Sequence, residues 1–398
     1  MIVIIGALVL EDRVIDEGSL VIEGGRITAV ESRPVHPAGA ELVHAAGGHV
    51  VPGFIDVHVH GLLGHDVLDG DGAVRAVAGL LPRVGVTSFC PTSVACTPEV
   101  LDEFLREVAC LRADTPGHAA RVLCAHVESS FINPLYAGAQ PAGCLRVPDA
   151  CGAPPGGDFS TSDLLRVIEG AGPAVGVVTL APELSGGLAL VRTLASSGRC
   201  VSLGHSGADF ETAEAAFDAG ARHVTHLFNR LAPMTARAPG LIGAALARPD
   251  VRVELIGDGH HVHPAVCRMV MAAKGPRAVM AVTDATAGAG LPPGSLARLG
   301  GRRLRVGEGA AYLDDGTLAG GTCTMARVFR QVRAWRGSIV DAAVMCATTP
   351  ARAVGRSDLG VLRPGAAADL VVLDHAGDVR RTMVDGVFVH GAMRPPEH

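Results

Sequence analysis

Two histidines separated by one residue, His58 and His60, lie in the apolar stretch GFIDVHVHG at residues 53–61. Side chains alternate along a strand, so both imidazole rings would face the same side. Imidazoles placed this way can bind a divalent metal. A chain with 17 histidines also produces such pairs by chance. The pair alone is therefore weak evidence, and two histidines on an ordinary strand remain the alternative.

More histidines and carboxylates stand at the ends of other apolar runs. They are Glu128, His205, His226 and Asp284. Imidazoles and carboxylates from separate strands that meet at one rim supply the ligands a divalent metal requires. We therefore predict a metal site from the whole set. Because these other residues stand at strand ends as well, we interpret His58 and His60 as metal ligands.

Asp284 has a predicted role of its own. Metal coordination lowers the pKa of a bound water toward neutrality. A carboxylate beside that water can accept its proton and later pass the proton to a leaving amine. A metal ligand or a helix cap is the alternative role for this aspartate, and we favour the general base.

Four other histidines near strand-like runs need a separate interpretation. His126 shares a face with Glu128 but lies one step deeper, so we interpret it as a packed residue. His260, His261 and His263 cluster in IGDGHHVHP after a strand-like run. They are either a second metal cluster or, as a loop beyond a strand end, part of a substrate site.

The elements that must position these residues read as an α/β chain. Short apolar runs alternate with amphipathic stretches from about residue 50 to residue 283, which predicts a (β/α)8 TIM-like barrel with chemistry at the C-terminal strand ends. A doubly wound sheet is the rival, but its first strand usually leads to a glycine-rich phosphate turn rather than to histidines. The runs are VPGFIDVHVH, VTSFCPT, RVLCAHVES, VGVVTLAPE, CVSLGHS, HVTHLFN, VRVELIGDG and AVMAVTDA.

The two chain ends differ from this pattern. Residues 1–49 and 356–398 read as hairpins, so we expect them to build one small β-sandwich domain beside a barrel of residues 50–355. The glycine-rich excursion at 285–320 follows the eighth strand and is a predicted lid.

Composition excludes several classes of function. The chain has 398 residues, 48% of them apolar, and a mild net charge of −6 without a basic stripe, so nucleic acid is not an expected partner. No apolar run reaches the length of about 20 residues that a membrane span needs, and the opening MIVIIGALVL reads as a strand rather than a signal peptide. Ten scattered cysteines without a CxxC pair indicate reduced thiols in the cytoplasm.

Ten segments together resemble the N-acetylglucosamine-6-phosphate deacetylase family of the amidohydrolase superfamily. The resemblance covers nearly the whole chain. The segments are PGFIDVHVHG, HVESSFINP, VTLAPE, SLGHS, THLFN, RAPGLIGAAL, DGHHV, VTDAT, GTLAGGTCTM and ATTPARAVG. Many binuclear amidohydrolases use a carboxylated lysine at the end of the fourth strand. The sole lysine here, Lys274, follows the seventh run, so that bridge is excluded.

The resemblance implies a role for each matching residue. Glu128, His205 and His226 would hold the principal metal, and His58 and His60 would hold a second one, giving one or two ions. Zinc fits such ligands, and iron or manganese would also be tolerated. Asp284 matches the catalytic aspartate. Asn229 and His261 match residues near the sugar phosphate, and Arg237 matches an arginine that reaches the phosphate from the neighbouring subunit of a homodimer.

Three segments depart from the family pattern. Ser129 and Ser130 replace a Gly-Pro pair after the third-strand glutamate. Gln140 stands where the family has a histidine that polarises the substrate carbonyl, and Arg230 follows Asn229 where the family has alanine. We keep Gln140 and Arg230 as predicted substrate-binding residues.

The predicted function is metal-dependent removal of the N-acetyl group from N-acetylglucosamine 6-phosphate, a small-molecule substrate. The departures keep open a deacylase of a different N-acyl amino sugar. A catalytically silent sugar-phosphate-binding protein and a zinc-dependent deaminase are weaker alternatives.

Overall fold

The computed structural model describes residues 1–128, 130–149 and 158–391. Eight parallel strands pair in chain order to form the predicted barrel. The last strand returns to the first, because Asp284 N donates to His58 O (3.0 Å) and His60 N donates to Ala285 O (2.7 Å). The strands are β5 (Phe54–Val59), β8 (Val86–Ser93), β10 (Ala125–Glu128), β11 (Val175–Leu180), β12 (Cys200–Leu203), β13 (His223–Val224), β14 (Arg252–Ile256) and β15 (Val279–Val282). A short extra strand, β9 (Arg121–Val122), pairs with β8.

Burial explains why the barrel strands read as continuous apolar runs. Every residue of β5 and of β8 is buried, as expected for parallel strands covered on both faces. The helices bury one stripe instead: α2 (Pro98–Ala113) begins with proline at its first position and buries Leu101, Leu105 and Val108, at helical spacing. The other helices are α1 (Ala73–Leu80), α3 (Thr161–Gly170), α4 (Gly187–Ser196), α5 (Phe210–Asp218), α6 (Gly240–Ala247), α7 (Pro264–Lys274), α8 (Met325–Arg336), α9 (Ile339–Ala343) and α10 (Thr349–Ala353).

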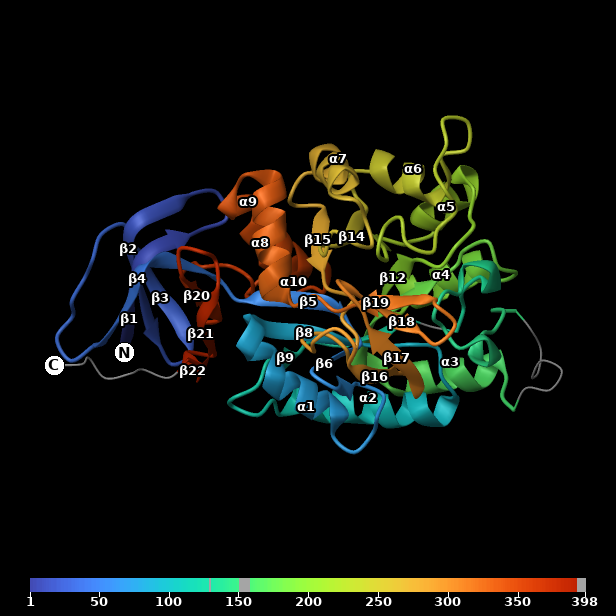
Figure 1. The fold of residues 1–398 in the computed structure, drawn as a ribbon, viewed down its shortest axis with the longest axis horizontal. Coiled ribbons are helices and arrows are strands. Elements are labelled where there is room, and N and C mark those ends of the chain that lie inside the picture. Colours follow the sequence, from blue (N-terminus) through green and yellow to red (C-terminus); the bar gives the residue numbers. More distant parts are fainter. Residues whose placement is uncertain (129, 150–157, 392–398) are drawn as a thin grey trace.

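The two chain ends build a separate sheet together, as predicted (Figure 1). The blue strands β1–β4 lie beside the red strands β20–β22. Their order is β22-β21-β20-β4-β1-β2-β3, and the opening run is β1. The sheet packs around one apolar core. Backbone bonds from Ile27 N to Ala366 O (3.0 Å) and from Ala368 N to Gly25 O (2.8 Å) tie the two chain ends together. The strands are β1 (Ile2–Val9), β2 (Val14–Glu23), β3 (Arg26–Glu31), β4 (Glu41–Pro52), β20 (Leu370–Leu373), β21 (Val379–Val384) and β22 (Val387–His390). The domain limits at 49/50 and 355/356 stay a prediction, and 392–398 lie outside the described residues.

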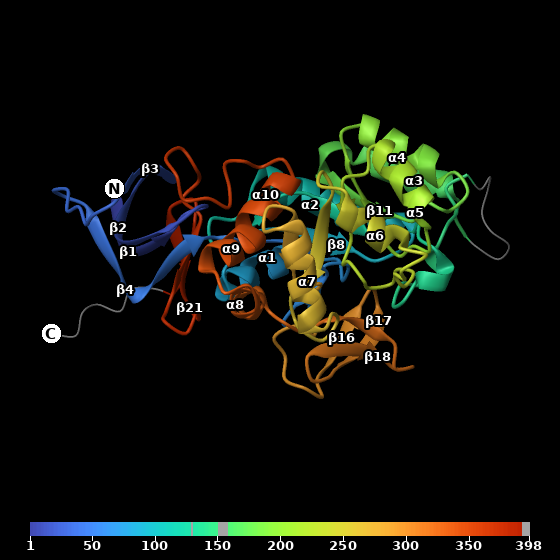
Figure 2. The same cartoon turned by 90° about the horizontal axis from the view of Figure 1, so that it is seen from above.

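The excursion after the eighth strand is an ordered four-stranded antiparallel sheet, which stands at one side of the barrel in Figure 2. It contains β16 (Leu296–Leu299), β17 (Arg302–Val306), β18 (Ala310–Leu313) and β19 (Leu318–Gly321). Its last strand is joined to the end of β15 by the bond from Gly321 N to Asp284 O (2.7 Å). This sheet therefore stands at the barrel rim that carries Asp284. A hairpin of β6 (Gly61–Leu62) and β7 (His65–Asp66) follows β5.

None of the described helices combines the length and the apolar character needed to cross a membrane.

Candidate metal and catalytic site

Glu128, His205 and His226 meet at the C-terminal rim of the barrel. Glu128 is the last residue of β10, and each histidine follows its strand, β12 or β13, by two residues. His205 Nε2 lies 3.0 Å and His226 Nε2 lies 2.9 Å from Glu128 Oε1, and the two imidazole nitrogens are 3.1 Å apart. All three side chains are buried, so this triplet offers three ligand atoms to one metal ion.

The backbone at this rim is unusual. His205, His226 and Asp284 have φ angles of 48°, 29° and 48°, in the left-handed region. Non-glycine residues there cost about 1–3 kcal/mol each and cluster at functional sites. Three strand-end residues of the site share this feature, which supports a functional reason for the geometry.

The hydrogen bonds of the imidazoles fit a metal. His205 Nδ1 donates to Tyr136 O (2.8 Å), and His60 Nδ1 donates to Thr92 O (2.9 Å). A proton fixed on Nδ1 leaves Nε2 with a lone pair, which is the ordinary arrangement of a metal-binding histidine. Both Nε2 atoms face the cluster.

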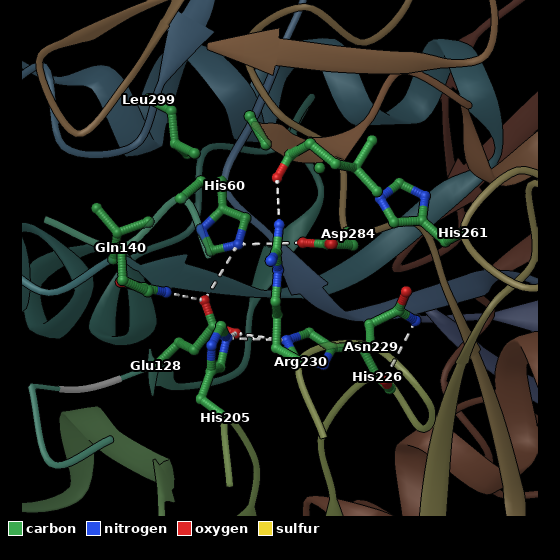
Figure 3. Close-up of a pocket in the computed structure, with 15 residues that line it drawn as sticks. His60, Glu128, Gln140, His205, His226, Asn229, Arg230, His261, Asp284 and Leu299 are labelled. Atoms are coloured by element: carbon green, nitrogen blue, oxygen red, sulfur yellow. Dashed lines mark hydrogen bonds and ion pairs between the residues drawn. The ribbon is translucent and has the colours of Figure 1, made fainter. Parts of the chain in front are cut away.

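A second triplet adjoins the first. His58 Nε2 and His60 Nε2 are 3.2 Å apart and lie 3.4 Å and 3.2 Å from Asp284 Oδ1. His60 Nε2 is also 3.6 Å from Glu128 Oε2. The dashed lines of Figure 3 join His60 to both carboxylates. The two triplets thus form one continuous cluster, which the sequence predicted as a set.

The charges of the buried side chains also support a metal site. Burial opposes ionisation, yet the surrounding imidazoles lower the pKa of Glu128 well below its usual range and hold the pKa of Asp284 at about 2. Burial likewise opposes charge on His58, but Glu254 and Glu128 raise its pKa to about 10. The cluster is strongly negative without its protons, and such a cluster favours a divalent cation.

Two buried carboxylates beneath the cluster were missed by the sequence reading. Glu254 Oε2 on β14 accepts from His58 Nδ1 (2.8 Å) and from His226 N (3.2 Å). Asp56 on β5 accepts from Thr283 Oγ1 (2.5 Å), and burial raises its pKa to about 7. The available signal was a carboxylate inside an apolar run, as in FIDVHV and VRVELI, whereas only strand ends were considered.

Glu183 was also missed, although it ends the VTLAPE segment. Its carboxylate accepts from Asn133 Nδ2 (2.9 Å), Ser206 Oγ (2.7 Å) and Gly207 N (2.6 Å). It therefore ties the loop after β10 to the residues next to His205. Three donors on one carboxylate hold the position of His205 from outside the cluster.

His126 is buried deeper in the barrel. Its Nδ1 donates to Val57 O (3.1 Å), and its Nε2 accepts from Thr179 Oγ1 (2.7 Å). Burial lowers its pKa to about 4, so it is neutral. Both nitrogens have partners, in keeping with a packed residue.

One pocket opens above the cluster, with about 50 Å³ of free volume (Figure 3). Of the predicted substrate residues, Gln140, Asn229, Arg230 and His261 line it together with Asp284. Leu299 and Leu318 of the four-stranded sheet complete the wall. Arg237 does not line it; Arg237 is exposed and borders a separate surface hollow with Gly207 and Asp209.

Two basic side chains, His261 and Arg230, line the pocket together with residues of both triplets. His261 Nδ1 donates to Asp258 Oδ2 (2.6 Å), and despite burial this carboxylate raises the pKa of His261. Arg230 has a φ of 52°, and its Nη2 donates to Leu318 O (3.4 Å). A Cβ on Gly138 would lie 2.5 Å from Arg230 Nε, so the arginine packs against that glycine.

Gln140 is buried, and its side-chain Nε2 donates to Glu128 Oε2 (2.5 Å). Ser130 is buried too. Ser129, the other departure after the third strand, lies outside the described residues.

Comparisons with known proteins agree with this geometry. Residues 195–391 match the amidohydrolase family model. The chain is 33% identical to an N-acetylglucosamine-6-phosphate deacetylase of Bacillus subtilis, over 96% of this chain and 94% of that protein. It is also 33% identical to an N-acetylgalactosamine-6-phosphate deacetylase of Escherichia coli O157:H7, over 95% and 96%.

A solved structure is similar throughout. It is a variant of N-acetyl-D-glucosamine-6-phosphate deacetylase from Mycobacterium smegmatis in complex with N-acetyl-D-glucosamine-6-phosphate. The TM-score is 0.87 and the identity 31%, covering 98% of this chain and 99% of that one. With the barrel, the rim cluster and these similarities in agreement, the chain belongs to the N-acetylglucosamine-6-phosphate deacetylase family of metal-dependent amidohydrolases.

Proposed function

We propose that the protein hydrolyses N-acetylglucosamine 6-phosphate to glucosamine 6-phosphate and acetate. The observation that carries this proposal is a single pocket lined both by the metal-binding cluster with Asp284 and by two basic side chains, Arg230 and His261. In this proposal the N-acetyl group of the substrate meets the cluster, and the phosphate of the same molecule meets Arg230 and His261.

Glu128, His205 and His226 hold the principal metal in this proposal, and His58 and His60 hold a second ion. Zinc is the proposed metal because most of the ligands are imidazoles, and iron or manganese would be accepted by the same ligands. A metal bound by these residues would polarise the amide carbonyl and lower the pKa of the attacking water.

Asp284 moves the proton. Its carboxylate is ionised, since its pKa is about 2, and its Oδ1 lies 3.2 Å from His60 Nε2 inside the cluster. It takes a proton from the attacking water as the new carbon–oxygen bond forms. It then gives that proton to the nitrogen as the carbon–nitrogen bond breaks, so acetic acid and a neutral amine result, and the acid then loses its proton to water to become acetate.

Asn229, Arg230 and His261 bind the sugar phosphate. The guanidinium fork suits phosphate oxygens, and Asp258 orients His261 and, against the effect of burial, raises its pKa. Arg237 is exposed on the loop before α6 and borders a different hollow. We propose that it reaches the phosphate of a neighbouring subunit in a homodimer.

Substrate entry requires movement at the pocket mouth. The free volume of about 50 Å³ is below the roughly 300–1,000 Å³ of typical small-molecule sites. The side chain of Arg230 and strand β19 border the mouth. We therefore keep the four-stranded sheet as the proposed lid.

The second candidate is deacylation of a different N-acyl amino sugar. The replacement of the family's alanine by Arg230 favours it, and so does the similarity to an N-acetylgalactosamine-6-phosphate deacetylase. The catalytically silent binding protein is disfavoured because both triplets and Asp284 are intact.

A substrate panel separates these candidates. Zinc-loaded protein is given N-acetylglucosamine 6-phosphate, N-acetylgalactosamine 6-phosphate and both unphosphorylated sugars, and free amine is measured. We expect the highest kcat/KM with N-acetylglucosamine 6-phosphate and loss of turnover after chelation. A clear preference for another sugar would replace the proposed substrate, and binding without turnover of any sugar would support the catalytically silent protein.

The proposed compartment is the cytoplasm, where the nine described cysteines, all free, would stay reduced.

A further inference from the structure

Gln140 has both ends of its side-chain amide engaged. The residue is 5% exposed. Ala95 N donates to Gln140 Oε1 (2.7 Å), and Gln140 Nε2 donates to Glu128 Oε2 (2.5 Å). A backbone N–H can only donate, so the amide oxygen must face Ala95 and the amide nitrogen must face Glu128. The orientation of this amide is thus fixed by its partners.

The two oxygens of Glu128 are used differently as a result. Oε1 lies 3.0 Å from His205 Nε2 and 2.9 Å from His226 Nε2, whereas Oε2 accepts from Gln140. The terminal torsion of a glutamate is soft. Without Gln140 the carboxylate could turn and bring Oε2 toward His60 Nε2, which is 3.6 Å away.

We infer that Gln140 is a positioning residue that holds the Glu128 carboxylate so that Oε1 is presented to the metal together with His205 and His226. A neutral amide suits this task, because it donates to the carboxylate without bringing a charge into the triplet. The inference rests on the proposed role of Glu128 as a metal ligand, and it goes beyond the substrate contact that the sequence predicted for Gln140.

The loop that carries Gln140 is itself held in place. Gln140 N donates to Ala137 O (3.1 Å), and Arg302 Nη1 of the four-stranded sheet donates to Ala139 O (2.9 Å). A side chain that orients a metal ligand must sit on a fixed backbone. Outer partners of this kind typically change metal affinity by about 10- to 100-fold when they are removed.

The test measures zinc affinity without substrate. Gln140→Met keeps the length of the side chain and removes both amide bonds, and Gln331→Met is the control, since Gln331 donates to Asp258 O and does not contact Glu128. Competition with a chelating dye gives the zinc Kd, and KM and kcat are measured at saturating zinc. We expect the Gln140→Met Kd to weaken by about 10- to 100-fold, an unchanged control and little change in KM.

An unchanged zinc Kd would overturn the inference, and a raised KM beside it would assign Gln140 to the substrate. Gln140→Asn is the second variant should Gln140→Met fail to fold; its shorter amide cannot span from Ala95 to Glu128, so the same weakening is expected. Because zinc binding is measured without sugar, the result stands whether or not N-acetylglucosamine 6-phosphate is turned over.

Discussion

At the residue scale, the site depends on opposite charges packed into a small buried volume. Glu128 and Asp284 face four imidazoles, and Glu254 supports them from below. The backbone carbonyls of Thr92 and Tyr136 set which imidazole nitrogen carries the proton. These outer partners therefore orient the ligands at this rim.

Substitution of Arg230 tests whether this side chain recognises the phosphate. Arg230→Met should raise KM for N-acetylglucosamine 6-phosphate by roughly 10- to 100-fold, because a hydrogen bond to a charged group contributes about 1.5–3 kcal/mol. KM for unphosphorylated N-acetylglucosamine should change little, and Arg230→Lys should retain part of the affinity. Steady-state kinetics with both sugars measures this. Equal losses for the two sugars would mean that Arg230 does not recognise the phosphate.

At the element scale, the four-stranded sheet is fastened to the barrel rim at several points. Gly300 N donates to Asp66 Oδ2 (2.6 Å), and Arg302 Nη1 donates to Ala139 O (2.9 Å). Leu299 and Leu304 share an apolar cluster with Val94. The sheet thereby holds the pocket wall formed by Leu318 and its neighbours.

Arg302 and Arg303 offer a matched pair of substitutions. Arg302→Met removes the bond to the Gln140 loop and should raise KM by roughly 10-fold, because a hydrogen bond from a charged group contributes at least about 1.5 kcal/mol. Arg303→Met removes only an exposed pair with Asp314 and should leave KM unchanged. Steady-state kinetics gives KM for both variants. Equal KM values would contradict a role for the sheet in closing the pocket.

The sequence predicts the barrel well because strands buried on both faces leave apolar runs, and because ligands at strand ends are visible as polar residues after those runs. It does not predict the bond between Glu254 and His58, which are 196 residues apart and meet only when the barrel closes. Nor does it predict that Gln140 binds Glu128, since that contact depends on the course of an irregular loop. The hydrophobic pattern of one segment does not reveal its contacts with distant segments.

At the scale of the whole molecule, Arg121 joins the barrel to the terminal sheet. It lies on β9, and its guanidinium pairs with Asp369 and Asp385, each at 2.5 Å. Asp369 is buried, and it also accepts from Asp385 N (2.8 Å). Burial raises the pKa of Asp369, although Arg121 opposes this shift.

Arg121→Met should cost about 3–5 kcal/mol of unfolding free energy near neutral pH, because a buried carboxylate loses its partner. The folded pKa of Asp369 then lies further above its unfolded value, so the cost grows as pH rises through the folded pKa and vanishes below the unfolded one. The Tm deficit should be larger at pH 7.5 than at pH 4.5. Arg106→Met, which removes an exposed pair with Asp102, should lose no more than about 0.5 kcal/mol. A deficit independent of pH would contradict this account.

The most direct test of the central claim is the release of free amine from N-acetylglucosamine 6-phosphate by zinc-loaded protein, beside an Asp284→Asn variant with verified zinc content. The account predicts rapid release by the unaltered protein and a fall in kcat of at least about 100-fold in the variant, because the amide cannot accept the proton of the attacking water. Absence of release by the zinc-loaded protein would contradict the proposed substrate, and undiminished release by the variant would contradict the role of Asp284.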